Sequence, residues 1–224
     1  MLISASRQSG KSTATAAKAL HVALFVSGAL VLLMSKSQKQ ASELLRKVKE
    51  FHRPFKEAFP VRAESVLQFE LKNNSRVLSL PSDEGTVRGY SGADLVVIDE
   101  ASRVADAVFN SATPMLGVSQ GALVLLSTPY GRRGFFYNEW EHGGDEWERF
   151  KTTASDCPRY TEDFLALERK RMGPRQFEEE YGGAFVEDLE DARNPRVFSG
   201  NERLLDEIFS DDIPVISAKK GENP

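Results

Sequence analysis

The sequence predicts an α/β fold, namely an open, mostly parallel β-sheet with helices on both faces. Two observations predict it. Apolar runs of strand length alternate with stretches of helical period, as in sheets whose strands are covered on both sides; the runs are 29–34, 94–98 and 122–126. The chain also opens with a short apolar strand, a loop of small residues and Gly10-Lys11-Ser12 at a helix start. Its 224 residues suit one large domain or a domain with an appendage.

The composition excludes several classes of protein. Hydrophobic residues at 41% and charged residues at 28% indicate a globular chain with a sizeable core. The single cysteine, Cys157, excludes an internal disulfide and suits a reducing compartment, and the three histidines show no zinc-ligand spacing. No apolar run reaches the length of a membrane span, so no membrane partner is expected. The net charge of −4 means that any DNA contact must come from a local basic patch.

The first half of the chain contains the first two predicted helices. One helix is predicted to run to about Val26, where Ser27-Gly28 ends it. After strand 29–34, Ser37 is predicted to cap a second helix. Its apolar side is predicted to consist of Ala41, Leu44, Leu45, Val48, Phe51 and Phe55.

A change of period follows the second helix. Apolar and polar residues alternate over 67–71 and again over 76–80, which predicts a hairpin that turns at Asn73-Asn74. The segment 81–92 is polar and contains glycine, with no helix or strand signal. A loop of this length inside a compact domain is typically functional.

The second half repeats the alternation of strands and helices. Strand 94–98 ends in Asp99-Glu100, and strand 122–126 ends in Ser127-Thr128. The other predicted elements are a helix around 106–110, a second beginning near 113–114, a helix over 133–141, a polar strand over 147–152 and helices over 162–172 and 174–181. The predicted divisions are a core over 1–154, a helical lid or linker subdomain over 155–187, and a linker or the start of a further domain over 188–224.

The loop between the first strand and the first helix has the spacing of a phosphate-binding P-loop, G-x-x-x-x-G-K-[ST], with Ala5 in place of the first glycine. Backbone N–H groups, the positive end of the helix dipole and Lys11 converge in such a loop, where polyphosphate binds. A chance match at a helix start is the alternative. The residues expected to bind nucleotide are Ser6, Arg7, Gln8, Ser9, Gly10, Lys11, Ser12 and Thr13.

Polar residues at the end of strand 94–98 supply the rest of the chemistry. The carboxyl ends of parallel strands meet at one edge of the sheet, so Asp99 and Glu100 are expected beside the P-loop. Lys11 is expected to neutralise the outer phosphates, and Ser12 and Asp99 are expected to hold Mg²⁺, Asp99 through water. Glu100 is the expected catalytic base that orients and deprotonates the attacking water. Together these residues predict a P-loop NTPase of the ASCE, RecA-like type that uses ATP and Mg²⁺.

The end of strand 122–126 is the candidate coupling element. Ser127 or Thr128 is expected to hydrogen-bond the γ-phosphate or the attacking water and so to sense hydrolysis. Taken alone, Ser-Thr-Pro is also a common turn, and Asp-Glu after an apolar run is often only a solvated strand exit. The P-loop upstream on the same predicted sheet favours the functional interpretation of both.

Several stretches resemble the large terminase subunits of tailed bacteriophages and herpesviruses. The most specific is Arg7-Gln8 directly before Ser9-Gly10-Lys11-Ser12. The others are Thr86-Val-Arg-Gly89 before Leu95-Val-Val-Ile-Asp-Glu-Ala101, Leu126-Ser-Thr-Pro-Tyr-Gly131, and Phe177-Glu-Glu-Glu-Tyr181 followed by Phe185. The resemblance spans roughly residues 1 to 187.

The resemblance implies an ATP-driven motor that pumps double-stranded DNA into procapsids. It implies a catalytic role for Arg7 as a cis-acting arginine on the γ-phosphate, the alternative being an arginine solvated at the loop rim. It also implies an arginine supplied by a neighbouring subunit, for which Arg46 and Arg53 on the second predicted helix are weak candidates, the alternative for each being an arginine solvated on the helix surface. The implied partners are a homo-oligomeric ring (a pentamer by resemblance), a portal protein and a small terminase subunit. The implied location is the host cytoplasm, transiently at the procapsid.

Three further arginines have two interpretations each. Arg88 either senses nucleotide or shapes its loop. Arg132 and Arg133, beside the coupling element, either contact DNA phosphates or form a solvated pair.

The chain also departs from the resemblance at both ends. Members of that family carry an adenine-gripping segment upstream of the P-loop and a C-terminal nuclease domain with metal-binding aspartates. Here the chain starts four residues before Ala5, and no buried strand presents the late aspartates Asp188, Asp191, Asp206, Asp211 and Asp212. The sequence therefore predicts a motor domain truncated at both ends, without nuclease activity. The alternatives are a helicase-like translocase, because Asp99-Glu100-Ala101-Ser102 resembles a DExx signature, and a remnant that binds nucleotide weakly.

Overall fold

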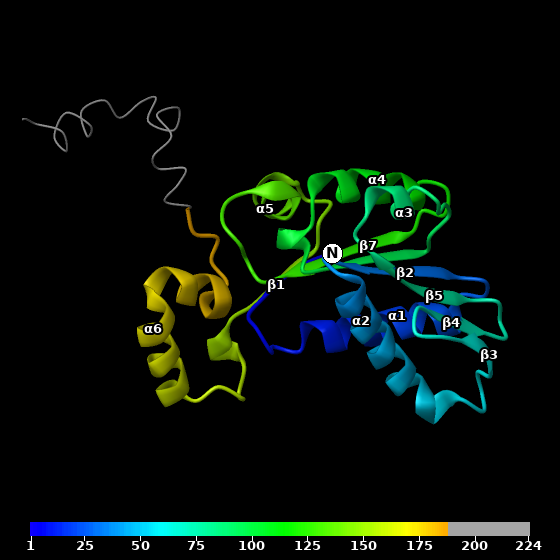
Figure 1. The fold of residues 1–224 in the computed structure, drawn as a ribbon, viewed down its shortest axis with the longest axis horizontal. Coiled ribbons are helices and arrows are strands. Elements are labelled where there is room, and N and C mark those ends of the chain that lie inside the picture. The colour runs from blue at the N-terminus through cyan, green and yellow to red at the C-terminus, as the bar shows by residue number, and fades with distance from the viewer. Residues whose placement is uncertain (188–224) are drawn as a thin grey trace, which may run out of the picture. The chain divides into compact units, whose positions relative to one another are not determined.

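The computed structural model describes residues 1–187, and the predicted linker or further domain at 188–224 lies outside them. Residues Met1–Val186 form one compact unit built on a single eight-stranded sheet (Figure 1). The strands are β1 (Leu2–Ala5), β2 (Leu30–Ser35), β3 (Val61–Glu64), β4 (Gln68–Leu71), β5 (Arg76–Pro81), β6 (Leu95–Asp99), β7 (Ala122–Ser127) and β8 (Arg149–Thr152). The α-helices are α1 (Lys11–Phe25), α2 (Gln38–His52), α3 (Glu84–Val87), α4 (Asp106–Leu116), α5 (Gly134–His142) and α6 (Glu162–Phe177). Four single-turn elements are η1 (Arg53–Phe55), η2 (Ala101–Arg103), η3 (Ala154–Asp156) and η4 (Glu178–Gly182).

The sheet is open and mostly parallel, which confirms the predicted fold class. Its strand order is β3-β4-β5-β2-β6-β7-β1-β8. All neighbours from β5 to β8 pair in parallel, and only β3 with β4 and β4 with β5 are antiparallel. Strand β7 lies between β1 and β6, so the loop after β1 and the residues after β6 reach the same edge of the sheet.

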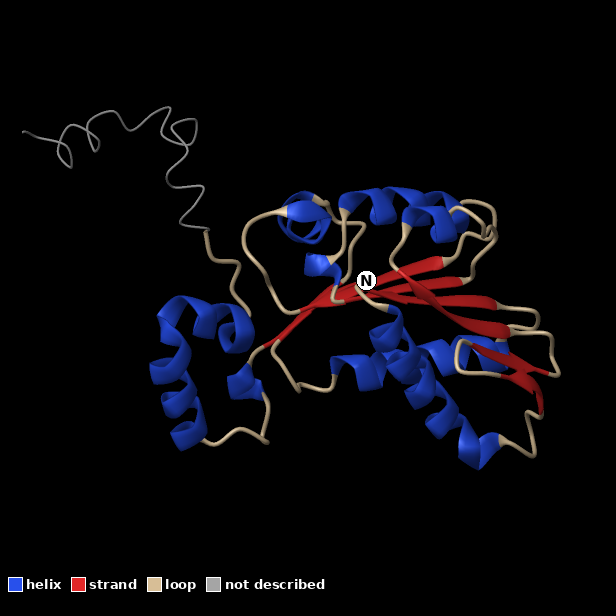
Figure 2. Cartoon of the chain, viewed as in Figure 1, coloured by secondary structure: helices blue, strands red, loops and turns tan. Residues whose placement is uncertain are grey.

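Helices cover both faces of the sheet, as Figure 2 shows, with α1 and α2 on one side and α3, α4 and α5 on the other. Each face has its own hydrophobic cluster. Leu20, Leu45 and Val48 belong to the cluster under α1 and α2, whereas Val108 and Phe136 belong to the cluster under α4 and α5. The central strands β2 and β6 are buried along their whole length, which explains their unbroken apolar sequences.

The second helix begins as predicted, but its buried side is different near its C-terminus. The Ser37 hydroxyl accepts a hydrogen bond from the Gln40 N–H at 3.4 Å and caps α2. The prediction that Phe51 and Phe55 continue the buried face is wrong, because they are 36% and 47% exposed. His52 takes that place, with its Nε2 2.7 Å from the carbonyl oxygen of Phe59.

The predicted hairpin exists, but it extends the main sheet. Strand β5 pairs antiparallel with β4 on one side and parallel with β2 on the other. Residues Val77 to Leu80 are therefore buried on both faces, which an alternating pattern does not describe. The preceding strand β3 was not predicted, because three of its four residues are exposed and it carries no alternation.

Two further predictions are corrected and one is confirmed. The segment 81–92 contains the short helix α3, and α4 is one continuous helix with Pro114 in its last turn, where two helices were predicted. The break between helices at 172 and 174 is confirmed by Gly173, whose φ of 78° interrupts α6. Phe177 and Tyr181 form a small cluster with Ala154, and the predicted boundary at residue 154 stays a prediction.

Candidate functional site

The P-loop lies between β1 and α1, at the edge of the sheet where β6 and β7 also end. Ala5, in the position of the missing glycine, is the buried last residue of β1. The Ser6 N–H donates to the Thr152 carbonyl oxygen at 2.9 Å, which ties the loop to β8. Gln8 and Gly10 adopt left-handed backbone conformations, with φ of 53° and 94°. These two residues let the chain reverse from the strand into the helix.

The start of α1 leaves polar groups available to a ligand. Thr13 and Ala14 donate their N–H groups to the Gly10 carbonyl, so helical bonding does not use the amides of Lys11 and Ser12. The hydroxyl oxygens of Ser6 and Ser9 are buried and have no hydrogen-bond partner within the described part of the chain. Orphaned buried donors at a helix N-terminus fit an anion such as a nucleotide phosphate.

Ser12 and Asp99, the two predicted Mg²⁺ ligands, are in contact. The Ser12 hydroxyl donates to Asp99 Oδ2 at 3.2 Å, and the Glu100 N–H donates to Oδ1 at 2.9 Å. Asp99 is only 8% exposed, and burial, followed by the charge of Glu100, raises the pKa of its carboxyl. One hydroxyl and one carboxylate suit Mg²⁺, which keeps several water ligands. Within residues 1–187, no group of three or more His, Cys, Asp and Glu side chains forms a metal cluster.

A cavity of about 210 Å³ opens beside this pair, between the start of α1 and helix α2. Its lining residues from α2 were not identified in the sequence; they are Lys39, Gln40, Glu43, Leu44 and Lys47. Nothing in their spacing distinguishes them from the solvated side of an amphipathic helix. The cavity shows that α2, not only the strand ends, borders the site.

Glu100 lies at the exit of β6 in a left-handed conformation, with φ of 56° and ψ of 38°. A non-glycine residue in this region is uncommon and marks a local constraint. Its carboxylate accepts a hydrogen bond from Arg103 at 3.4 Å. Glu100 is the single residue between the end of β6 at Asp99 and the start of η2 at Ala101.

The coupling residues at the end of β7 are joined to the residues after β6. The Ser102 and Ser127 hydroxyls lie 2.6 Å apart, and the Ser102 N–H donates to the Ser127 hydroxyl at 3.2 Å. The Ser102 hydroxyl also lies 2.8 Å from the Thr128 carbonyl oxygen. Both coupling residues are buried. Ser102 was not singled out in the sequence, and it connects the two strand ends directly.

Arg7 pairs with Glu180, a partner that the sequence did not indicate. Its Nε lies 2.5 Å from Glu180 Oε2, and its Nη2 lies 3.0 Å from Glu180 Oε1. This hydrogen bonding is the main cause that raises the pKa of Arg7. Two residues between η3 and α6 hold the loop backbone: the Tyr160 hydroxyl donates to the Arg7 carbonyl at 2.5 Å, and Arg159 donates to the Gln8 carbonyl at 3.3 Å.

The other candidate arginines lie apart from this contact. Arg46 is exposed and pairs with Glu43 and Glu50 on its own helix, and Arg53 is exposed at the start of η1. Glu43 lines the cavity beside Asp99, whereas Arg46 is not among the residues that line it. Their role in trans stays a prediction.

The arginines near the coupling element and the 81–92 segment each have a defined environment. Arg88 lines a cavity of about 550 Å³ against α4. Arg132 donates to the Phe185 carbonyl at 3.3 Å, and the Arg133 guanidinium lies 4.8 Å from the centre of the Tyr130 ring. Whether any of them contacts nucleotide or DNA stays a prediction.

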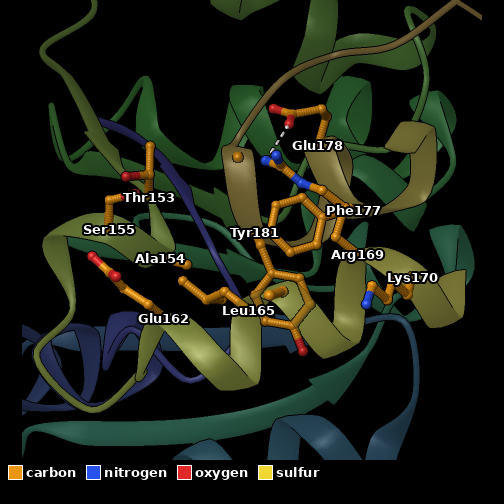
Figure 3. Close-up of a pocket in the computed structure, with 12 residues that line it drawn as sticks. Thr153, Ala154, Ser155, Glu162, Leu165, Arg169, Lys170, Phe177, Glu178 and Tyr181 are labelled. Carbon is orange, nitrogen blue, oxygen red and sulfur yellow. Dashed lines mark hydrogen bonds and ion pairs between the residues drawn. The ribbon is translucent and has the colours of Figure 1, made fainter. Parts of the chain in front are cut away.

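A separate cavity of about 640 Å³ lies in the helical segment after β8, between η3, α6 and η4. Figure 3 shows the rings of Phe177 and Tyr181 side by side at its centre, with Arg169 paired to Glu178 at 3.3 Å above them. Its other lining residues include Leu165. This cavity therefore belongs to the segment that carries Glu180.

Comparison with known proteins gives one family and a consistent set of folds. The family model described as "Terminase large subunit, T4likevirus-type, N-terminal" matches residues 2–204. No curated protein sequence matches significantly. In the described part of the chain, no helix combines the length and apolar character needed to cross a membrane.

Three similar solved structures are phage proteins. The Thermus phage P74-26 large terminase ATPase domain has a TM-score of 0.71 at 21% identity, covering 83% of this chain and 88% of that one. A large terminase from a thermophilic bacteriophage, in complex with ADP, has a TM-score of 0.66 at 14% identity, covering 83% and 48%. The HK97 bacteriophage large terminase has a TM-score of 0.67 at 16% identity, covering 84% and 46%. At these identities the likeness establishes the fold, and the chain spans about half the length of the latter two.

Proposed function

The chain belongs to the T4-like-virus-type terminase large subunit family, and on this basis we propose that it is an Mg-ATP-hydrolysing motor domain that drives double-stranded DNA into a procapsid. The observation that carries the proposal is the contact between Ser12 and Asp99 beside the unused amides of the P-loop. That arrangement is what binding of a metal-bound triphosphate requires. Solved structures of the thermophilic bacteriophage's large terminase in complex with ADP and with ATP-gamma-S support nucleotide as the ligand.

Each residue of the site has a distinct role in the proposal. The amides of Lys11 and Ser12, the Lys11 ammonium and the hydroxyls of Ser6 and Ser9 bind the phosphate oxygens. Ser12 and Asp99 hold Mg²⁺, which when bound neutralises phosphate charge. Glu100 orients a water molecule and accepts its proton. The buried Asp99, held by two hydrogen bonds, is fixed in position before a ligand arrives.

The proposed partners follow from the family. They are double-stranded DNA, further copies of the chain in a ring, a portal protein and a small terminase subunit, within the host cytoplasm and transiently at the procapsid. Arg132 and Arg133 are the proposed DNA contacts, because they are close in sequence and follow the coupling residues. The family match favours this motor over a helicase-like translocase.

The Glu100→Gln variant tests the catalytic assignment. It keeps the shape of the side chain and removes the proton acceptor, so we expect Mg-ATP hydrolysis to fall by about 100-fold or more, while the nucleotide-induced rise in melting temperature remains. Glu57→Gln, an exposed glutamate outside the site, is the matched control and should hydrolyse normally. Hydrolysis at the wild-type rate by Glu100→Gln would remove Glu100 from the mechanism.

A further inference from the structure

A pair of aromatic rings lies in the segment that follows β8, next to the P-loop. Strand β8 is the edge neighbour of β1, so the chain after β8 runs beside the loop that follows β1. Tyr160 lies in this segment, and Phe164 lies in the first turn of α6. The two rings are stacked, with their centroids 5.6 Å apart and their planes 12° from parallel.

Hydrogen bonds fix this segment to the main chain of the P-loop. The Tyr160 hydroxyl donates to the Arg7 carbonyl oxygen at 2.5 Å, and Arg159 Nη1 donates to the Gln8 carbonyl oxygen at 3.3 Å. Burial raises the pKa of the Tyr160 hydroxyl, so the hydroxyl keeps its proton and can donate it at neutral pH. Because both acceptors are backbone oxygens of consecutive loop residues, the aromatic pair has a defined position relative to the phosphate-binding amides.

A third ring supports the pair from within the segment after β8. The ring of Tyr181, which is buried, lies at 86° to that of Tyr160 and at 79° to that of Phe164. Phe164 itself is 39% exposed. A single exposed aromatic residue is ordinary on a protein surface. Here the exposed ring is stacked on a ring that is bonded to the P-loop, so it offers a flat apolar surface in a fixed place.

The order of the strands indicates which end of a nucleotide would reach this surface. Asp99 follows β6 and contacts Ser12, so the metal-binding end of the site lies on the β6 side of β1. The aromatic pair follows β8, on the other side of β1. The metal-bound phosphates and the base are opposite ends of a nucleotide. A nucleotide whose outer phosphates lie at Ser12 and Asp99 therefore extends its base toward β8.

We propose that Phe164 and Tyr160 form a platform on which the base of the bound nucleotide stacks. This rests on the proposed function and adds a base-binding subsite to it. Aromatic side chains bind bases through their flat faces, and every base has such a face. The platform therefore contributes affinity for a nucleoside triphosphate over its triphosphate part alone. Tyr160 has a second role, because its hydroxyl holds the platform against the loop.

The proposal is tested by comparing Mg-ATP with Mg-ribose triphosphate, which keeps the sugar and the phosphates and lacks only the base. Isothermal titration calorimetry gives both dissociation constants. We expect the wild type to bind Mg-ATP at least about tenfold more tightly, the size of effect that stacking of one base produces. Phe164→Ala should lose about this factor for Mg-ATP and bind Mg-ribose triphosphate as the wild type does. Phe164→Tyr keeps the ring and should bind both ligands normally.

A control variant and an optical signal separate stacking from a general effect on the fold. Phe55→Ala is the matched control, because Phe55 is an aromatic residue of similar exposure, 47%, in η1, and should leave both dissociation constants unchanged. The fluorescence of ethenoadenosine triphosphate reports stacking directly. It should be quenched on binding to the wild type and quenched less on binding to Phe164→Ala.

The outcomes distinguish this proposal from the proposed function. A wild-type chain that binds neither Mg-ATP nor Mg-ribose triphosphate contradicts the proposed function itself. Equal dissociation constants in the wild type, or an equal loss for both ligands in Phe164→Ala, overturn the base platform and leave the phosphate site intact. If Phe164→Ala does not fold, Phe164→Leu decides, because it keeps apolar bulk and removes the flat ring. A leucine variant that binds Mg-ATP as the wild type does overturns the platform.

Discussion

Replacing Gly10 with alanine tests the effect of backbone strain in the P-loop without the effect of a steric clash. Gly10 has φ of 94° and ψ of 5° at the N-terminal cap of α1, and an added Cβ meets no atom within 4 Å. The cost is therefore conformational, about 1–2 kcal/mol for an L residue in the left-handed region. For a domain of this size the melting temperature should fall by roughly 2–8 °C.

Gly10→Ala should weaken nucleotide binding more than it lowers the stability of the fold. The strain at residue 10 is relieved by rotating the loop, and this rotation re-aims the amides of Lys11 and Ser12. We expect the dissociation constant for Mg-ATP to rise by about tenfold or more. At a nucleotide concentration about 100 times the wild-type dissociation constant, the wild type gains about 2.7 kcal/mol of stability and a tenfold weaker variant about 1.4 kcal/mol.

Gly28→Ala is the matched control for this prediction. Gly28 has φ of 74°, an added Cβ there also meets no atom within 4 Å, and it follows the opposite end of α1 from the P-loop. Differential scanning fluorimetry with a titration of Mg-ATP measures both effects. The reasoning is refuted if Gly10→Ala keeps the wild-type gain from Mg-ATP, or if Gly28→Ala loses it.

Three further predictions concern the site and the fold. The first concerns Asp99→Asn, measured by urea unfolding in EDTA between pH 4 and pH 8. The free energy of unfolding of the wild type should fall relative to that of the variant as pH rises, because the raised pKa of the Asp99 carboxyl means that the folded chain favours its protonated form. A difference between the two chains that does not change with pH would contradict this. Ser102→Ala removes the links to Ser127 and Thr128, and should cost about 1–2 kcal/mol of stability and slow hydrolysis with binding retained; unchanged turnover would contradict a coupling role. Gly121→Ala places a Cβ 2.1 Å from the Ala93 carbonyl oxygen and should cost about 1–3 kcal/mol more than Gly89→Ala, where an added Cβ stays 3.5 Å from the Thr86 carbonyl oxygen; equal urea midpoints would refute this.

The sheet and the P-loop were predictable because their signals are local. Strands β2, β6 and β7 are covered on both faces and so read as unbroken apolar runs, and the G-K-S sequence marks the turn into α1. The contact of Ser12 with Asp99 followed from the rule that parallel strands end at a common edge. Periodicity failed where burial was partial: β3 is exposed, and in α2 a polar residue, His52, is buried where Phe51 is not.

The contacts of Arg7 were not predictable from local sequence. Glu180 is 173 positions away, and a run of three glutamates normally reads as a solvated face. Arg103 follows Glu100 by three positions, which was a usable signal for their pairing on one turn. Its second contact, with Glu180, depends on how η4 packs against the strand ends, and only the tertiary structure supplies that.

The melting temperature of the wild-type chain with and without Mg-ATP tests the nucleotide site most directly. A ligand that binds only the folded chain must raise it. We predict a rise with millimolar Mg-ATP, a smaller rise when EDTA removes Mg²⁺, and little or none in Lys11→Ala. No shift in the wild type at millimolar Mg-ATP would contradict a working nucleotide site and would favour a remnant that folds but binds nucleotide poorly.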